Sequence, residues 1–100
     1  MIVVLQADGS FRLDEPDDFR RFKVVVAGRR DMVADLRGRF DGIVDFADAD
    51  TAWVAIAALR GWTTEAAWLR QLATMIEKAA PHGWIDEAGR RVRAHVEWQD

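Results

Sequence analysis

The sequence predicts an α+β domain: a mainly antiparallel sheet built from hairpins, with a long amphipathic helix (about 64–80) packed across one face. Three observations predict this class. They are short apolar runs separated by turn residues, one long stretch with helical periodicity, and a final segment that alternates polar and apolar residues. The 100 residues fit one compact domain covering 1–100.

The first third of the chain predicts three strands. Residues 2–5 are an apolar run, Asp8-Gly9 suits a two-residue hairpin turn, and residues 11–14 alternate as a return strand would. The run KVVVA at residues 23–27 predicts a buried strand. Residues 29–40 stay open between a short helix and a loop, because Gly38 disfavours a continuous helix.

The middle of the chain predicts a further hairpin. Residues 43–46 and 52–56 are apolar runs that flank the turn residues Asp48 and Asp50. The second run could instead be helical, but its large apolar side chains would then surround the whole cylinder. A strand is therefore favoured.

Residues 65–80 carry the strongest helical pattern. One arc holds large apolar side chains, and the opposite face is polar, with Arg70, Gln71, Thr74, Glu77 and Lys78. Pro81 and Gly83 end the helix, and His82 lies where a protonated imidazole interacts favourably with the helix dipole. Trp68 belongs to the apolar arc and is predicted to be buried.

The last strand, residues 92–98, is predicted to pair with residues 84–85. Its two faces differ, because Val92, Ala94, Val96 and Trp98 alternate with Arg93, His95 and Glu97. The alternation indicates one packed face and one face towards solvent or a ligand. Trp98 is accordingly predicted to be buried.

The composition excludes several classes of protein. The 14 basic and 17 acidic residues give a net charge of −3, and neither half of the chain is basic, so no nucleic-acid partner is expected. The absence of cysteine excludes disulfides, thiolate metal sites and a cysteine nucleophile. No apolar run is long enough for a membrane span or a signal peptide, so no membrane association is expected. The Arg- and Ala-rich composition indicates a bacterial protein, expected in the cytoplasm.

Five residues are binding candidates: Arg93, His95, Glu97, Trp84 and Trp53. Arg93, His95 and Glu97 could orient an anion, or Glu97 could raise the pKa of His95 for acid–base chemistry. The alternative is that all three are polar residues on a solvated strand face. Trp53 and Trp84 are the tryptophans least committed to the core, and exposed Trp is typical of interfaces and apolar pockets.

No metal and no cofactor are predicted. Two histidines without a spaced third ligand are a weak metal signal, and Asp48 and Asp50 do not continue into a calcium-binding loop. Two functions remain. The first is a non-enzymatic interaction, accessory or homodimerising module that binds a protein partner or itself. The alternative binds an anionic or apolar small molecule, or is an acid–base enzyme domain using His95 with Arg93 and Glu97. A cavity against the His95 face would favour the alternative.

Overall fold

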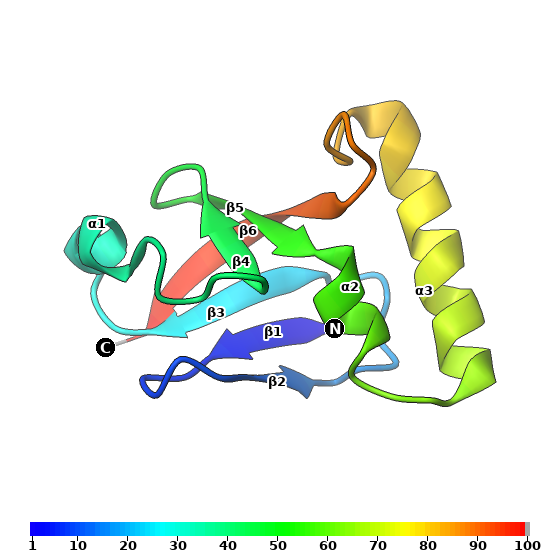
Figure 1. Cartoon of the computed structure of the whole chain (residues 1–100), viewed down its shortest axis with the longest axis horizontal. Helices are drawn as coiled ribbons and strands as arrows, with labels where there is room; N and C mark the ends of the chain where they lie inside the picture. Colours follow the sequence, from blue (N-terminus) through cyan, green and yellow to red (C-terminus); the bar gives the residue numbers. More distant parts are fainter. Residues whose placement is uncertain (100) are drawn as a thin grey trace.

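The computed structural model describes residues 1–99, which form a single sheet flanked by helices (Figure 1). The six strands have the order β2-β1-β3-β6-β5-β4. Along the chain they are β1 (Ile2–Leu5), β2 (Phe11–Asp14), β3 (Lys23–Ala27), β4 (Val44–Phe46), β5 (Thr51–Ala55) and β6 (Arg91–Gln99). The helices are α1 (Val33–Leu36), α2 (Ile56–Arg60) and α3 (Ala66–Ala79), with short 3₁₀ turns η1 (Arg30–Met32) and η2 (Ala80–His82).

The strand pairing is mostly antiparallel, as the predicted α+β class requires. β1 pairs with β2, β4 with β5, and β5 with β6 in this sense. The central strand β3 pairs in parallel with both β1 and β6, which the sequence analysis did not predict. These parallel neighbours come from distant parts of the chain, so no local turn signal announces them.

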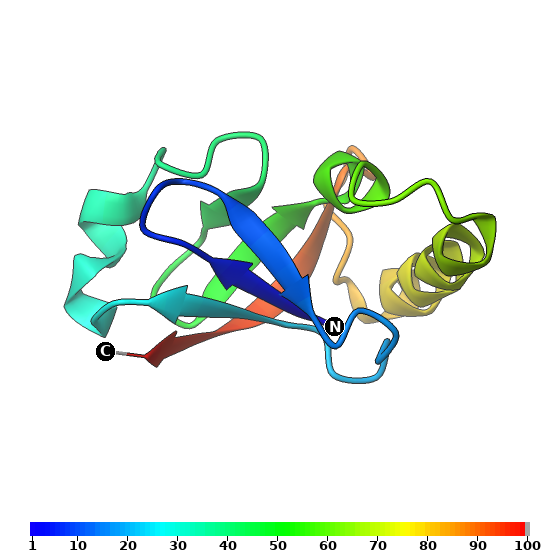
Figure 2. The same cartoon turned by 90° about the horizontal axis from the view of Figure 1, so that it is seen from below.

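The sheet is curled (Figure 2). One of its sides carries the hydrophobic core. Side chains that alternate along the strands fill this side, including Val3, Val24, Val54 and Val96. Fully burying such a side chain stabilises the fold by about 1.5–3 kcal/mol. In β6 the predicted alternation is present, because Val92, Ala94 and Val96 are buried while Arg93 and His95 are exposed.

The helix α3 lies beside one end of the sheet and crosses the direction of the strands (Figures 1 and 2). The sequence analysis expected it across one face. Its buried residues are Trp68, Leu72 and Ala79. The indole N–H of Trp68 donates a hydrogen bond of 2.9 Å to the Pro16 carbonyl oxygen, which ties α3 to the segment after β2. Because the helix lies at the end of the strands, space remains between its polar face and β6.

Residues 56–60 form the helix α2, whereas the sequence analysis expected a strand up to residue 56. The apolar run turns helical because Ile56 and Leu59, three residues apart, then share one face and both enter the core. The backbone N–H of Ile56 still donates to the Arg90 carbonyl oxygen at 2.9 Å, which continues the β5–β6 register by one residue before the helix begins. Over residues 1–99, no helix has the length and apolar character needed to cross a membrane.

Candidate functional site

The outer face of β6 presents Arg93 and His95, two of the residues selected from the sequence. His95 lies in register between Lys23 of β3 and Thr51 of β5. Arg93 lies opposite Trp53 of β5. Both side chains are exposed, so the alternation places a guanidinium and an imidazole two residues apart on an accessible surface.

Glu97 follows on the same face, but it has a different partner from the one expected. Its carboxylate accepts a hydrogen bond of 3.0 Å from the Lys23 ammonium group on β3. Among residues 1–99, Glu97 therefore pairs with Lys23 and makes no hydrogen bond or ion pair with His95. The parallel β3–β6 pairing brings Lys23 and Glu97 together, and this pairing could not be read from the local sequence.

A cleft of about 1170 Å³ separates α3 from β6, and we call it the α3–β6 cleft. One wall is the polar face of α3, with Arg70, Gln71, Thr74 and Lys78. The other wall is β6 with Arg93 and His95, and the ends are formed by η2 with Trp84 and by the segment around Phe22. Three of the five candidates, Arg93, His95 and Trp84, thus line one cavity.

The α3–β6 cleft is cationic although the chain as a whole is acidic. Four basic side chains line it, against one carboxylate, that of Asp50; they are Arg20, Arg70, Lys78 and Arg93. Within residues 1–99 none of these four makes an ion pair, whereas Asp50 binds the guanidinium of Arg30. Those hydrogen bonds from Arg30 lower the pKa of Asp50 below its ordinary value. The cleft therefore has positive charge that no described acidic group balances.

An aromatic surface forms one end of the cleft. The rings of His82 and Trp84 stack with centroids 4.3 Å apart and planes 20° apart. The side chain of Trp84 is 45% exposed, although Phe22 and Met75 offer apolar surface nearby in the same cleft. His82 thus acts as a stacking partner at the end of η2, in addition to any effect on the helix dipole. The cleft combines cations with an exposed aromatic ring.

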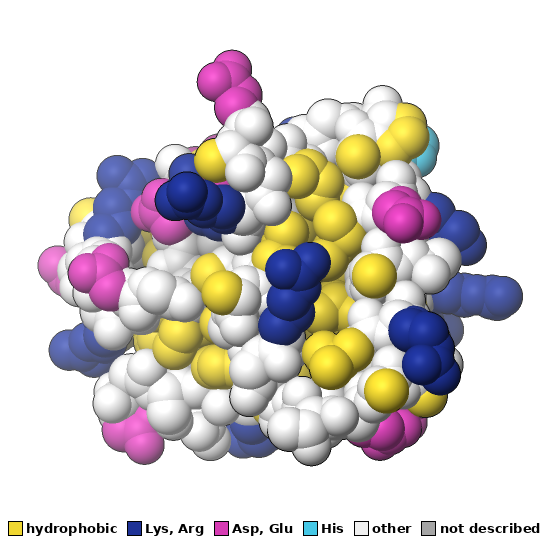
Figure 3. Space-filling model, turned by 45° about the vertical axis from the view of Figure 1, so that its right-hand side comes forward, with side chains coloured by type: hydrophobic (Ala, Val, Ile, Leu, Met, Phe, Trp, Pro, Cys, Tyr) yellow, Lys and Arg dark blue, Asp and Glu magenta, His cyan; other side chains and the backbone are white. Residues whose placement is uncertain are grey.

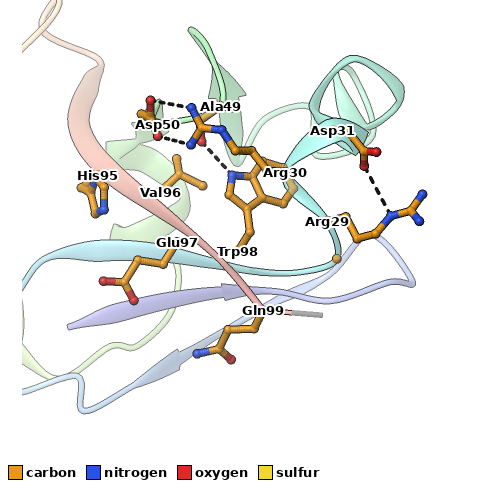
Figure 4. A pocket seen from close by; sticks show the side chains of 11 residues that line it. Arg29, Arg30, Asp31, Ala49, Asp50, His95, Val96, Glu97, Trp98 and Gln99 are labelled. Atoms are coloured by element: carbon orange, nitrogen blue, oxygen red, sulfur yellow. Dashed lines mark hydrogen bonds and ion pairs between the residues drawn. The ribbon is translucent and has the colours of Figure 1, made fainter.

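A second cavity, of about 1060 Å³, lies next to the C-terminal half of β6 and is called the Trp98 groove (Figure 4). The guanidinium of Arg30 lies over it and binds Asp50. The indole N–H of Trp98 donates to the Ala49 carbonyl oxygen at 2.7 Å, and its ring stacks on Phe46. Trp98 is half-buried, so the expectation that it is a core residue holds only in part.

Trp53 lies outside both cavities. It is half-buried, and the Arg91 guanidinium lies 6.0 Å from the centre of its ring. Arg91 in turn binds the carboxylates of Asp45 and Asp86, each at 2.9 Å. This arrangement places a paired cation beside the Trp53 ring on the β5 side of the sheet, away from the α3–β6 cleft.

The remaining tryptophans differ in burial. Trp68 is 3% exposed, which confirms the prediction that it is buried. Trp62 packs against Trp68 with ring centroids 5.2 Å apart but is itself 41% exposed.

Arg20, Arg70 and Lys78 were not among the candidates predicted from the sequence. Arg70 and Lys78 were assigned to the polar face of a helix, and such a face is ordinarily solvated. The available signal was the spacing of residues 70, 74 and 78, which recur about once per helical turn and therefore lie on one face. These residues and Gln71 line the cleft together. Only the position of α3 beside β6 shows that they face another wall.

Comparison with known proteins gave no match to a family model, a curated protein or a solved structure. Within residues 1–99, no three His, Cys, Asp or Glu side chains come together as a metal site. The function therefore has to be argued from the site itself.

Proposed function

We propose that this protein binds an anionic ligand with an apolar or aromatic portion in the α3–β6 cleft. The observation that carries the proposal is the group of four basic side chains without acidic partners among residues 1–99. The cavity that borders the His95 face favours the second function predicted from the sequence, binding of a small molecule, over a protein-interaction module.

The positive charge is local to the cleft, because the chain as a whole carries a net charge of −3. A cleft lined by charges of one sign, with low-dielectric walls, focuses the field and raises the local concentration of counter-ions. Arg70 and Lys78 approach from the helix and Arg93 from the strand, so an anion in the cleft receives donors from both walls. Hydrogen bonds to ionised groups are shorter and stronger than neutral ones. Two exposed cationic walls thus supply both attraction and orientation.

The apolar part of the ligand is argued from Trp84. An exposed aromatic ring already stacked on one side by His82 presents its remaining surface to an incoming apolar or planar group. Trp and Arg are also the residues that contribute most to binding free energy at interfaces. A ligand that combines both chemistries uses both features of the cleft.

The test compares a sulfonated and an uncharged probe of the same shape. We expect 8-anilino-1-naphthalenesulfonate to bind more tightly than N-phenyl-1-naphthylamine, as measured by fluorescence titration. In the double variant Arg70→Gln/Arg93→Gln the affinity for the sulfonate is expected to fall about tenfold, because two charge-assisted contacts are lost. The affinity for the neutral probe should be unchanged.

The control is Arg39→Gln, which removes one exposed guanidinium outside both cavities and is compared with each cleft variant taken singly, Arg70→Gln and Arg93→Gln. It should leave both affinities unchanged. Circular dichroism and urea unfolding establish that each variant is folded. Equal affinity for the two probes in the wild-type protein, or equal effects of the cleft and control variants, would overturn the proposal.

Association with a protein partner or a second copy is the second candidate function. Exposed Trp62 and Trp84 support it. Figure 3 shows hydrophobic side chains gathered in a band on the side of the molecule that carries α3, interrupted by a basic side chain. Light scattering over a wide concentration range tests self-association, and a constant monomer mass would exclude the homodimer.

A further inference from the structure

The α3–β6 cleft and the Trp98 groove are adjacent, and Asp50 and His95 line both. Figure 4 shows these two side chains at one end of the groove, with Trp98 and Gln99 further along β6. Small-molecule pockets typically measure about 300–1,000 Å³. Each of the two cavities already exceeds that range, at about 1170 and 1060 Å³. Two adjacent cavities that share lining residues favour an elongated occupant.

The edge of β6 is open where the groove begins. The β5–β6 pairing ends at Thr51 and His95, and its last bond runs from the Val96 N–H to the Asp50 carbonyl oxygen. Main-chain groups of alternate residues point to the same edge of a strand. The N–H and C=O of Trp98 therefore face the groove, and within residues 1–99 no strand pairs with them.

Gln99 confirms this alternation from the opposite edge. Its carbonyl oxygen accepts a hydrogen bond of 2.8 Å from the Gly28 N–H, on the β3 side of β6. An unpaired strand edge recognises the main chain of an extended peptide, since each unmatched N–H and C=O can form a ladder bond. A compact anion offers no such main chain.

The charges differ along the combined surface. The cleft end carries the unbalanced cations, whereas the groove end carries the Arg29–Asp31 and Arg30–Asp50 ion pairs. Asp50, at the junction, is neutralised by Arg30 and does not repel an acidic chain strongly. An extended chain advances about 3.3 Å per residue, so the six steps of β6 from Arg93 to Gln99 span about 20 Å, the length of a peptide of six or seven residues.

We propose that the ligand is an extended acidic segment of a partner protein. Its carboxylates lie against Arg70, Lys78 and Arg93, and its main chain pairs with Trp98. This inference rests on the proposed function, because it uses the same cationic cleft. It goes further in naming a peptide main chain as part of what is recognised.

The test uses the capped peptide Glu-Val-Glu-Phe-Glu-Val and two analogues in ¹H–¹⁵N correlation titrations of the full chain. One analogue replaces every Glu by Gln, and we expect about tenfold weaker binding because the charge-assisted contacts are lost. The other carries N-methyl groups on both Val residues, which remove main-chain donors. We expect this analogue to bind about three- to tenfold more weakly, and the Trp98 amide resonance should shift only with the unmethylated peptide.

The variant Gln99→Glu adds a negative charge at the groove end. It is expected to lower the affinity for the acidic peptide about threefold and to leave the affinity for the sulfonated naphthalene probe unchanged. Arg39→Gln changes the net charge by the same amount and should affect neither. Equal affinities of the methylated and unmethylated peptides, with no shift at Trp98, would overturn the inference while leaving the proposed function intact. Failure of the sulfonated probe to bind would instead overturn the proposed function.

Discussion

The backbone N–H of Arg93 donates a hydrogen bond of 2.7 Å to the carbonyl oxygen of Trp84. This bond ties the loop after η2 to β6, beside the isolated bridge between Ile85 and Val92. It holds the most exposed large aromatic side chain next to the exposed guanidinium of Arg93. Backbone contacts therefore hold the loop that carries the aromatic residue against the strand that carries the cation.

Trp84 and Trp53 should respond differently to truncation. Trp84→Ala is expected to weaken binding of the sulfonated probe about two- to tenfold, because a stacking surface is lost. Its effect on the free energy of unfolding should stay within about 1 kcal/mol, since nearly half of the residue's surface is already exposed in the folded state. Trp53→Ala should lower stability and leave the affinity unchanged. Fluorescence titration and urea unfolding check both variants, and the opposite pattern would place the aromatic site on β5.

Trp68→Phe should destabilise the fold by about 1–3 kcal/mol. The variant loses volume at a buried position and leaves the Pro16 carbonyl oxygen without its indole donor. Trp62→Phe is the matched control, because Trp62 is exposed and its indole makes no hydrogen bond within residues 1–99; it should change stability by less than about 0.5 kcal/mol. Urea unfolding measures both, and equal effects would show that Trp68 does not anchor α3.

Asp86 should stabilise the protein in a pH-dependent way. Its carboxylate accepts hydrogen bonds from the Arg91 guanidinium and from the backbone N–H groups of Arg90 and Arg91, and these bonds lower its pKa. Because the pKa is lower in the folded than in the unfolded state, the stabilisation is present above the unfolded value and is lost as the pH falls through the folded value.

The variant Asp86→Ala should therefore have a lower melting temperature than the wild-type protein at about pH 7, and the difference should shrink on acidification below about pH 4. Glu87→Ala is the control, since Glu87 has no ion pair within residues 1–99. Thermal unfolding monitored by circular dichroism over a pH series gives both differences. A difference for Asp86→Ala that stays constant with pH would show that the carboxylate charge is not what stabilises the turn.

The sequence was sufficient for most elements of the fold because hydrophobic periodicity is a local property. It predicted the faces of β6 and the extent of α3 to within a few residues. The parallel neighbours of β3 depend on contacts between distant segments, and no turn residue records them. The helix α2 was missed because an apolar run suits either a strand or a short helix, and burial of Ile56 and Leu59 decides between them.

Only one wall of the α3–β6 cleft, the strand β6, could be predicted from the sequence. Alternation in β6 identified Arg93 and His95, whereas Arg70 and Lys78 were part of a polar helix face with nothing in the sequence to indicate an opposing wall. Neither half of the chain is basic, so the net charge gave no indication of a cationic cleft. The cations that gather there come from distant positions. Near Arg20, the Asp18 carboxylate accepts a hydrogen bond from the Arg20 backbone N–H but forms its ion pair with the Arg21 guanidinium.

The most direct test of the cationic cleft is a ¹H–¹⁵N correlation titration of the wild-type protein with 8-anilino-1-naphthalenesulfonate. The five tryptophan indole N–H groups report from different places in the molecule. The account predicts the largest shifts at the Trp84 indole and the Arg93 side-chain N–H, with little change at the Trp53 and Trp62 indoles. The largest shift at the Trp62 indole, with Arg93 unmoved, would contradict it and place binding on the exposed apolar surface instead.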